Sequence, residues 1–217
     1  MVDYRSCLEN VRKHGNAELV AVSKMHGIDS VMEAYEQGAR IFGENRVQEA
    51  ESKFRDRPCD MKLYIIGHLQ SNKVRKAVAI ADRIESVDSV PLLERIESEC
   101  ARIDKTIEIL LEYNSSKEEN KSGFLDPEDL IAAARLSLSM PHIKLRGIMT
   151  VGPLGFDEKK NAEAFSDTKR LFDRIREITD ADVLSMGMSS DWKQALEYGS
   201  TEVRIGTAIF GERDYTA

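Results

Sequence analysis

The sequence predicts an α/β fold, a single (β/α)8 barrel of the TIM type with an extra N-terminal helix. Short runs rich in β-branched residues alternate with helical stretches along the whole chain. Eight such runs in 217 residues fit a barrel near the lower limit of size. Polar residues end several runs, where a barrel would gather them around one mouth: Lys24, Asn45, His68, Asn114 and Ser189. An open doubly wound sheet is the alternative, but it would string these residues along an edge.

The expected elements follow one another without interruption. The expected strands are residues 19–24, 40–45, 62–68, 83–87, 106–114, 144–152, 182–188 and 202–210. The amphipathic segment before residue 16 is expected to form the extra helix. No composition shift, Pro-rich linker or low-complexity tract divides the chain, so residues 1–217 are expected to form one domain.

Two segments between the strands carry clear helix signals. Residues 28–38 predict a helix with Asp29 or Ser30 as its N-cap and Gly38 as its stop. Asp126 is the expected N-cap of another helix, because a proline follows it at the first helical position. The repeated unit is therefore a strand followed by a helix.

Composition and charge narrow the class of partner. A net charge of −7 and a pI near 5.3 argue against a nucleic acid or an acidic membrane surface as the main partner. The three cysteines are widely spaced and the four histidines are scattered, so neither disulfides nor a metal site are expected. The sequence shows no signal peptide and no membrane-spanning run. We expect a cytoplasmic protein with a small-molecule ligand.

Lys24 follows the apolar run LVAV at the end of the first expected strand. In a barrel covered by helices its amine would point into the mouth, where partial loss of water disfavours the charged form. A neutral amine in such a place is a nucleophile for Schiff-base chemistry. The same side chain could instead extend to solvent at the rim, so Lys24 alone does not decide between these roles.

Two segments near the C-terminus are typical of a phosphate site. The run SMGMSSD passes from an expected strand into a helix that begins near residues 190–191, which places Ser189 at the helix start. Arg204, Gly206 and Thr207 lie in the last expected strand, where Gly206 lets the backbone approach a ligand closely. Barrels often bind phosphate with the loops after strands seven and eight. Each residue alone could be an ordinary turn or cap residue, but their joint placement predicts a phosphate site.

A lysine across a barrel mouth from a phosphate site is the arrangement that pyridoxal 5′-phosphate (PLP) requires. Seven runs then carry a family resemblance: LVAVSK, FGENRVQEA, IGHLQSNK, LLEYNSSKEENKSGF, RGIMTVGP, LSMGMSSD and VRIGTAIFGERDY. In this order they resemble the pyridoxal phosphate homeostasis protein family, whose barrel is similar to the N-terminal domain of alanine racemase and belongs to PLP fold-type III. The resemblance extends from about residue 17 to the C-terminus.

The resemblance implies roles for individual residues. Lys24 is similar to the lysine that holds PLP as a Schiff base. Ser189, Gly206 and Thr207 are similar to the phosphate-binding positions of the family. Arg204 takes the place of the arginine that lies near the pyridine nitrogen in related barrels, where a cation keeps that nitrogen unprotonated.

The resemblance also extends to the walls of the pocket. It implies that Asn45 lies against the ring, and that Lys121 has an accessory role in a basic loop. Many members of the family continue after the cofactor lysine with Thr-Lys-Pro, whereas residues 25–27 here are Met-His-Gly. The entrance is therefore expected to differ. His26 could reach the bond between Lys24 and the cofactor or only solvent, and solvent at the rim is the expected position.

The function implied by the resemblance is PLP binding in vitamin B6 and amino-acid homeostasis, by a carrier or regulator and not by an enzyme. PLP-dependent apo-enzymes are the expected acceptors. The sequence ends at Ala217, without the second β-domain of the racemases, so a monomer is expected.

A weak or uncharacterised PLP-dependent amino-acid racemase is the alternative function. Racemisation requires bases on both faces of the substrate, and Lys24 can supply only one. Tyr64 and Tyr113 fall inside expected strands and are expected in the core or the wall. A barrel aldolase that uses Lys24 without PLP is a more distant third interpretation.

Overall fold

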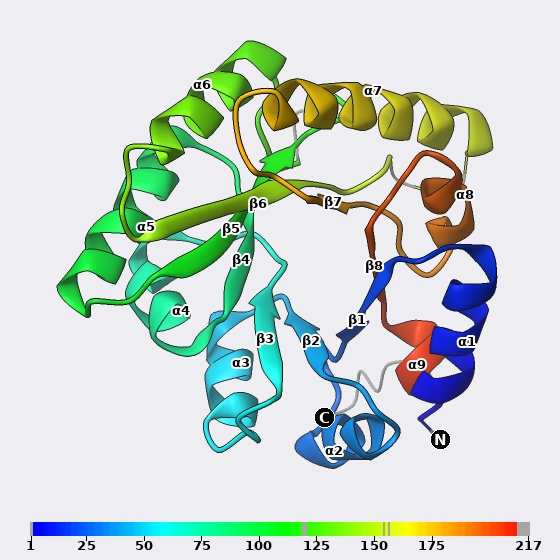
Figure 1. The fold of residues 1–217 in the computed structure, drawn as a ribbon. Coiled ribbons are helices and arrows are strands. Elements are labelled where there is room, and N and C mark those ends of the chain that lie inside the picture. Colours follow the sequence, from blue (N-terminus) through cyan, green and yellow to red (C-terminus); the bar gives the residue numbers. More distant parts are fainter. Residues whose placement is uncertain (1, 119–120, 154, 156, 212–217) are drawn as a thin grey trace.

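Eight parallel strands close into a barrel in the computed structural model, which describes residues 2–118, 121–153, 155 and 157–211. The strands are β1 (Glu18–Val22), β2 (Ile41–Glu44), β3 (Lys62–Ile65), β4 (Arg83–Val87), β5 (Ile107–Tyr113), β6 (Ile143–Thr150), β7 (Val183–Ser185) and β8 (Glu202–Ile205). Each pairs with the next, and β1 pairs with β8, Leu19 opposite Val203 and Ala21 opposite Ile205. Figure 1 shows the strands at the centre and the helices around them. The predicted barrel is confirmed.

The helices cover the outside of the barrel. They are α1 (Tyr4–His14), α2 (Ile28–Glu36), α3 (Val47–Phe54), the 3-10 turn η1 (Ser71–Lys73), α4 (Val74–Ile80), α5 (Val90–Arg102), α6 (Pro127–Ser137), α7 (Glu158–Arg176), α8 (Trp192–Glu197) and α9 (Thr207–Phe210). The predicted extra helix is α1, which lies beside α9 in Figure 1. The backbone N–H of Asp3 donates to the carbonyl of Ile209 at 2.8 Å. The start of the chain is thus fixed to the segment that follows β8.

The last strand is shorter than predicted. β8 ends at Ile205 and α9 follows it, so the prediction of a strand over 202–210 is wrong in its second half. The pairing of β8 with β1 ends where Ile205 lies opposite Ala21. Beyond that point the backbone has no strand to pair with, and a helical turn satisfies part of it internally. The same turn buries Ile209 and Phe210.

The helix signals are confirmed at two of three places. Asp126 caps α6 by accepting the backbone N–H two residues further on at 2.9 Å. Gly38 follows Gln37, the C-cap of α2, and adopts a φ of +106°, as expected of a stop residue. The predicted N-cap of α2 is wrong, because Gly27 occupies that position. Asp29, one of the two expected caps beside Ser30, instead lies in the first turn, where a negative charge favours the helix dipole.

The two faces of each strand meet different surroundings. On β8, Val203 and Ile205 belong to the main apolar cluster that includes helical residues. Glu202 and Arg204 alternate with them and are also buried, inside the barrel. The interior is therefore a mixed environment in which charged side chains lie near a small apolar group made of Val20, Ile41 and Tyr64.

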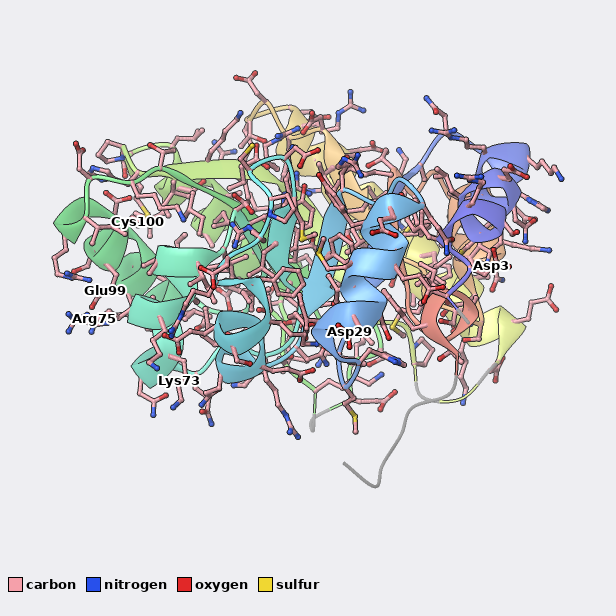
Figure 2. All side chains as sticks on the ribbon, turned by 90° about the horizontal axis from the view of Figure 1, so that it is seen from below. Asp3, Asp29, Lys73, Arg75, Glu99 and Cys100 are labelled. Atoms are coloured by element: carbon pink, nitrogen blue, oxygen red, sulfur yellow. The ribbon has the colours of Figure 1, made fainter. Side chains whose placement is uncertain are left out.

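The outer layer of helices presents charged side chains to water. Asp29, on α2, and Arg75, on α4, are exposed, and Figure 2 shows them on this layer together with Lys73. Such charges recur in the helices of the described ranges, and none of these helices has the length and apolar character needed to cross a lipid bilayer.

Candidate functional site

A cavity of about 370 Å³ lies where the strands end and their connecting loops begin. Its wall includes all six residues predicted from the sequence: Lys24, Asn45, Ser189, Arg204, Gly206 and Thr207. They come from the segments after β1, β2 and β7 and from the end of β8. The barrel therefore brings together side chains that are far apart in the sequence.

The residues on both sides of Lys24 are held by acidic side chains. The hydroxyl of Ser23 donates to Oε1 of Glu44 at 2.6 Å. The N–H of Met25 donates to Oε1 of Glu49 at 2.6 Å. Met25 has a φ of +64°, in the left-handed region that residues other than glycine rarely adopt. These contacts hold the tight turn from which Lys24, itself half-buried, lines the cavity.

Lys53, on α3, joins these acceptors behind the turn. Its Nζ lies 2.7 Å from Oε1 of Glu44, 2.8 Å from Oε1 of Glu49 and 2.8 Å from the carbonyl oxygen of Ser23. Glu44 is fully buried, and burial raises its pKa, although Lys53 and Ser23 oppose the rise. The cluster is a compact buried support for the strand end that bears Lys24.

Arg204 is the fixed cation of the cavity. It is almost completely buried, and arginine remains protonated in proteins. Its Nη1 donates to the hydroxyl of Ser185 at 2.6 Å, and its Nη2 donates to the carbonyl of Thr150 at 2.7 Å. Two bonds from different nitrogens restrict the plane of the guanidinium to one orientation.

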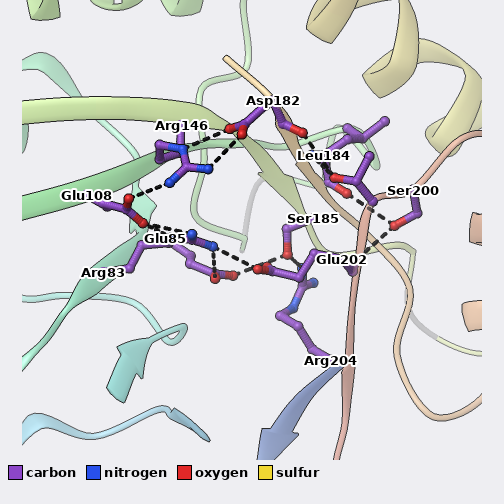
Figure 3. A network of polar contacts seen from close by, with 11 residues as sticks. Arg83, Glu85, Glu108, Arg146, Asp182, Leu184, Ser185, Ser200, Glu202 and Arg204 are labelled. Atoms are coloured by element: carbon purple, nitrogen blue, oxygen red, sulfur yellow. Dashed lines mark hydrogen bonds and ion pairs between the residues drawn. The ribbon is translucent and has the colours of Figure 1, made fainter. Parts of the chain in front are cut away.

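Arg204 belongs to a polar network that runs through the barrel interior, shown in Figure 3. The hydroxyl of Ser185 donates to Oε2 of Glu85 at 3.2 Å, and Nη1 of Arg83 donates to Oε2 of Glu202 at 2.8 Å. Burial raises the pKa of Glu85 well above its ordinary value, and the neighbouring Glu202 raises it further. Glu85 therefore keeps its proton to a higher pH than an exposed glutamate, which limits the negative charge near Arg204.

The loops after β7 and β8 supply hydrogen-bond donors to the cavity. Ser189 and Ser190 precede α8, and Thr207 begins α9, whose first N–H groups have no acceptor within the helix. Gly206 brings this loop close to β1, because a Cβ here would lie only 3.0 Å from the carbonyl oxygen of Val22. Together with Lys24 and Arg204 in the same wall, these donors suit an anionic group.

The structure changes the positions expected for two residues. His26 is half-buried in the cavity wall, and its ring stacks on Phe210 with 5.2 Å between centroids, so the expectation that it faces only solvent is wrong. Lys121 is not among the residues of this cavity. Its Nζ donates to the carbonyl of Gly152 at 2.8 Å and to Glu118, and the residue lines a neighbouring cavity.

Several contributors were not singled out from the sequence. They are Ile66, Val151, Met188 and Ser190 in the wall, and Glu44 and Lys53 behind it. Ser190 adjoins Ser189 in SMGMSSD, and Glu44 adjoins Asn45 in FGEN, so both were within reach of the motifs. Lys53 had no such signal, because its charged segment KFRDR has the composition of an exposed helix face.

Known proteins of the same fold share both the sequence and the architecture of this chain. The family model for the N-terminal domain of alanine racemase matches residues 4–214. The pyridoxal phosphate homeostasis protein of Haemophilus influenzae is 35% identical, covering 97% of this chain and 91% of that protein. PipY of Synechococcus elongatus, in a structure with PLP bound, is 35% identical with a TM-score of 0.86, covering 96% of this chain and 100% of PipY. Alanine racemase from E. faecalis shares the fold at 19% identity, with a TM-score of 0.72 and 59% of its own chain covered. This chain belongs to the alanine racemase N-terminal domain family and, within it, to the pyridoxal phosphate homeostasis proteins.

Proposed function

We propose that this protein binds PLP covalently through the amine of Lys24 and acts in intracellular PLP and amino-acid homeostasis. The observation that carries the proposal is that Lys24 and Arg204 line one cavity with Ser189, Gly206 and Thr207. Further support comes from PipY, which is 35% identical and has a structure with PLP bound, and from relatives named for PLP homeostasis.

The cavity fits PLP in size and in chemistry. Its volume of about 370 Å³ lies within the range of about 300–1,000 Å³ usual for small-molecule sites. PLP combines an anionic phosphate, an aldehyde and an aromatic ring. The wall offers the hydroxyls of Ser189 and Thr207, the amine of Lys24, and the apolar side chains of Val22 and Ile66. Each part of the cofactor thus has a matching group.

Pyridoxal phosphate supplies an aldehyde that condenses reversibly with a primary amine. Lys24 provides that amine, and Lys53 and Glu49 hold the backbone around it in place. Ser189 and Thr207 would bind the phosphate from the two loops, and the absence of a side chain at position 206 lets the second loop lie close to β1.

Two residues orient the ring in this proposal. Arg204 would lie near the pyridine nitrogen, where its positive charge would disfavour protonation of that nitrogen. An unprotonated ring withdraws electrons less strongly than a protonated one. Asn45 lines the same cavity and would offer its amide to the ring.

A carrier role is favoured over catalysis because racemisation needs two bases. Tyr64 and Tyr113 are 1% and 3% exposed, and neither is among the described residues that line this cavity. His26 does line it, and this single observation keeps a weak racemase as the second candidate. Incubation of the PLP-loaded protein with L-alanine in D2O distinguishes the two. Deuterium at Cα together with D-alanine would establish racemisation, and a carrier would form neither.

The covalent attachment has a direct test. Wild-type protein supplied with PLP should absorb visible light, and borohydride reduction followed by mass spectrometry should find the pyridoxyl group on Lys24. Lys24→Ala should lose the absorbance and keep its far-UV circular dichroism. Lys73→Ala, on the outer layer, is the matched control and should behave as wild type. A folded wild-type protein that stays colourless with PLP would contradict the proposal and favour the aldolase interpretation.

We propose further that residues 1–217 form one PLP-binding domain that is monomeric and cytoplasmic, and that PLP-dependent apo-enzymes accept its cofactor. Sedimentation velocity measures the first property, and cell fractionation measures the second. Transfer is measured by the activity regained when an apo-enzyme is mixed with the loaded protein, compared with the same total concentration of free PLP.

A further inference from the structure

A second cavity, of about 570 Å³, adjoins the proposed cofactor cavity, and Val151 lies in the walls of both. It is formed by β5 and by the segments that follow β3, β4 and β5. The polar residues of its wall are His68, Asp88, Glu112, Asn114, Lys121 and Ser122. The proposed cofactor site uses none of them.

Glu112 is the residue of this cavity whose hydrogen bonds are incomplete. It lies on β5 and is 5% exposed. Its Oε1 accepts a hydrogen bond from the hydroxyl of Ser122 at 2.7 Å. Its Oε2 is buried and has no hydrogen-bond partner in the described part of the chain. A buried carboxylate oxygen without a donor is costly, so this oxygen calls for a cationic or hydrogen-bonding ligand.

The other charged groups of the wall already make contacts. Oδ2 of Asp88 lies 3.0 Å from Nδ1 of His68. Nζ of Lys121 donates to the carbonyl of Gly152 at 2.8 Å and lies 3.1 Å from Oε1 of Glu118. Asp88 and Lys121 are therefore paired with other groups, and neither donates a hydrogen bond to Oε2 of Glu112.

The lining favours an organic cation over a metal ion. In the described ranges no group of three or more His, Cys, Asp or Glu side chains is placed to hold a metal. An ammonium group carries three N–H donors, and a charge-assisted hydrogen bond to a carboxylate is roughly twice as strong as a neutral one. We propose that the second cavity binds a primary ammonium group, that of an α-amino acid or of a simple amine, through Oε2 of Glu112.

The position of the cavity gives this binding a consequence. Because Val151 is shared by both walls, an amine held at Glu112 would lie beside the proposed PLP site. This consequence rests on the proposed function, whereas ammonium binding itself does not. Lys121 brings an ammonium group to the same wall, which favours a zwitterion over an amine without a carboxylate.

The experiment is an NMR titration of ¹⁵N-labelled full-length protein without added PLP, using L-alanine, ethylammonium and propionate in turn. L-Alanine and ethylammonium should shift the amides of residues 112–114 and 122, whereas propionate, which lacks the ammonium, should not. Glu112→Gln keeps the acceptor for Ser122 but removes the charge, and should weaken ammonium binding at least about tenfold. Glu94→Gln, an exposed site on α5, is the charge-matched control and should bind as wild type.

The ligands also separate the two sources of the ammonium. Tighter binding of L-alanine than of ethylammonium would identify amino acids, and equal binding would identify simple amines. The proposal is overturned if neither ligand shifts these amides, if propionate shifts them equally, or if Glu112→Gln binds as wild type with an unchanged melting temperature. Because the titration contains no PLP, its result is independent of whether Lys24 binds the cofactor.

Discussion

The amine of Lys53 lies 2.8 Å from the carbonyl oxygen of Ser23, the residue before Lys24. The same amine pairs with Glu44 and Glu49, which in turn accept hydrogen bonds from the hydroxyl of Ser23 and the backbone N–H of Met25, on either side of Lys24. One nearly buried cation therefore supports the strand end that carries the proposed cofactor lysine. The position of Lys24 depends on charges that do not themselves line the cavity.

Lys53→Met should destabilise the protein and weaken its hold on PLP. Breaking a buried ion pair leaves an uncompensated charge, here on Glu44, at a cost of about 3–5 kcal/mol. Urea unfolding measures the loss, and the visible absorbance after dialysis measures retention of PLP. Adding Glu44→Gln removes the stranded charge and should restore part of the stability.

Lys76→Met is the matched control for this experiment. Its Nζ lies 2.7 Å from Glu51, but the lysine side chain is 53% exposed. Exposed ion pairs contribute about 0–1 kcal/mol, so this variant should keep nearly all of the stability and all of the PLP. Equal effects of the two variants would mean that the Lys53 cluster has no special role.

Gly206→Ala should weaken PLP binding with little effect on the fold. The new Cβ would lie 3.0 Å from the carbonyl oxygen of Val22, which forces the proposed phosphate loop away from β1 by a few tenths of an ångström. We expect a Kd about tenfold higher, by fluorescence titration. Gly27→Ala is the control, because a Cβ there has nothing within 4 Å and the φ of −70° is ordinary. Similar affinity of both variants would remove position 206 from the site.

The sequence was sufficient for the barrel and the cavity because both leave local signals. Most strands are short runs rich in apolar residues, and Lys24, Asn45 and Ser189 stand within a few residues after the ends of such strands. In a parallel barrel all strands end on the same side, so residues with this one property must meet. No long-range information was required to predict their proximity.

The features that the sequence did not predict correctly depend on contacts between distant segments. The run TAIF has the composition of a strand, and only the end of the pairing between β1 and β8 makes it a helix. The position of His26 also depends on this helix, because its ring stacks on Phe210, which belongs to it. In the sequence, Lys53 resembles an exposed helix residue and Glu112 resembles an ordinary strand residue. Their burial depends on neighbours from other elements.

Glu85→Gln should flatten the dependence of stability on pH. The pKa of Glu85 is raised in the folded protein by burial and by Glu202, against the opposing charges of Arg204 and Arg83. The folded state therefore binds the proton more tightly than the unfolded state does. This contribution to stability is complete below the unfolded pKa of about 4.3 and is lost as the pH rises through the folded pKa. Its size is about 1.4 kcal/mol for each pH unit between the unfolded and the folded pKa.

Glutamine cannot ionise, and it keeps both an acceptor for Ser185 and a donor for its surroundings. The variant should therefore gain stability relative to wild type as the pH rises above the unfolded pKa of about 4.3, measured by urea unfolding at each pH. Glu94→Gln, at an exposed position, should follow the wild-type curve throughout. A curve of stability against pH for Glu85→Gln that runs parallel to that of wild type would contradict this prediction. It would mean that the carboxyl of Glu85 does not hold its proton as its burial predicts. The network around Arg204 would then carry an additional negative charge close to the proposed PLP site.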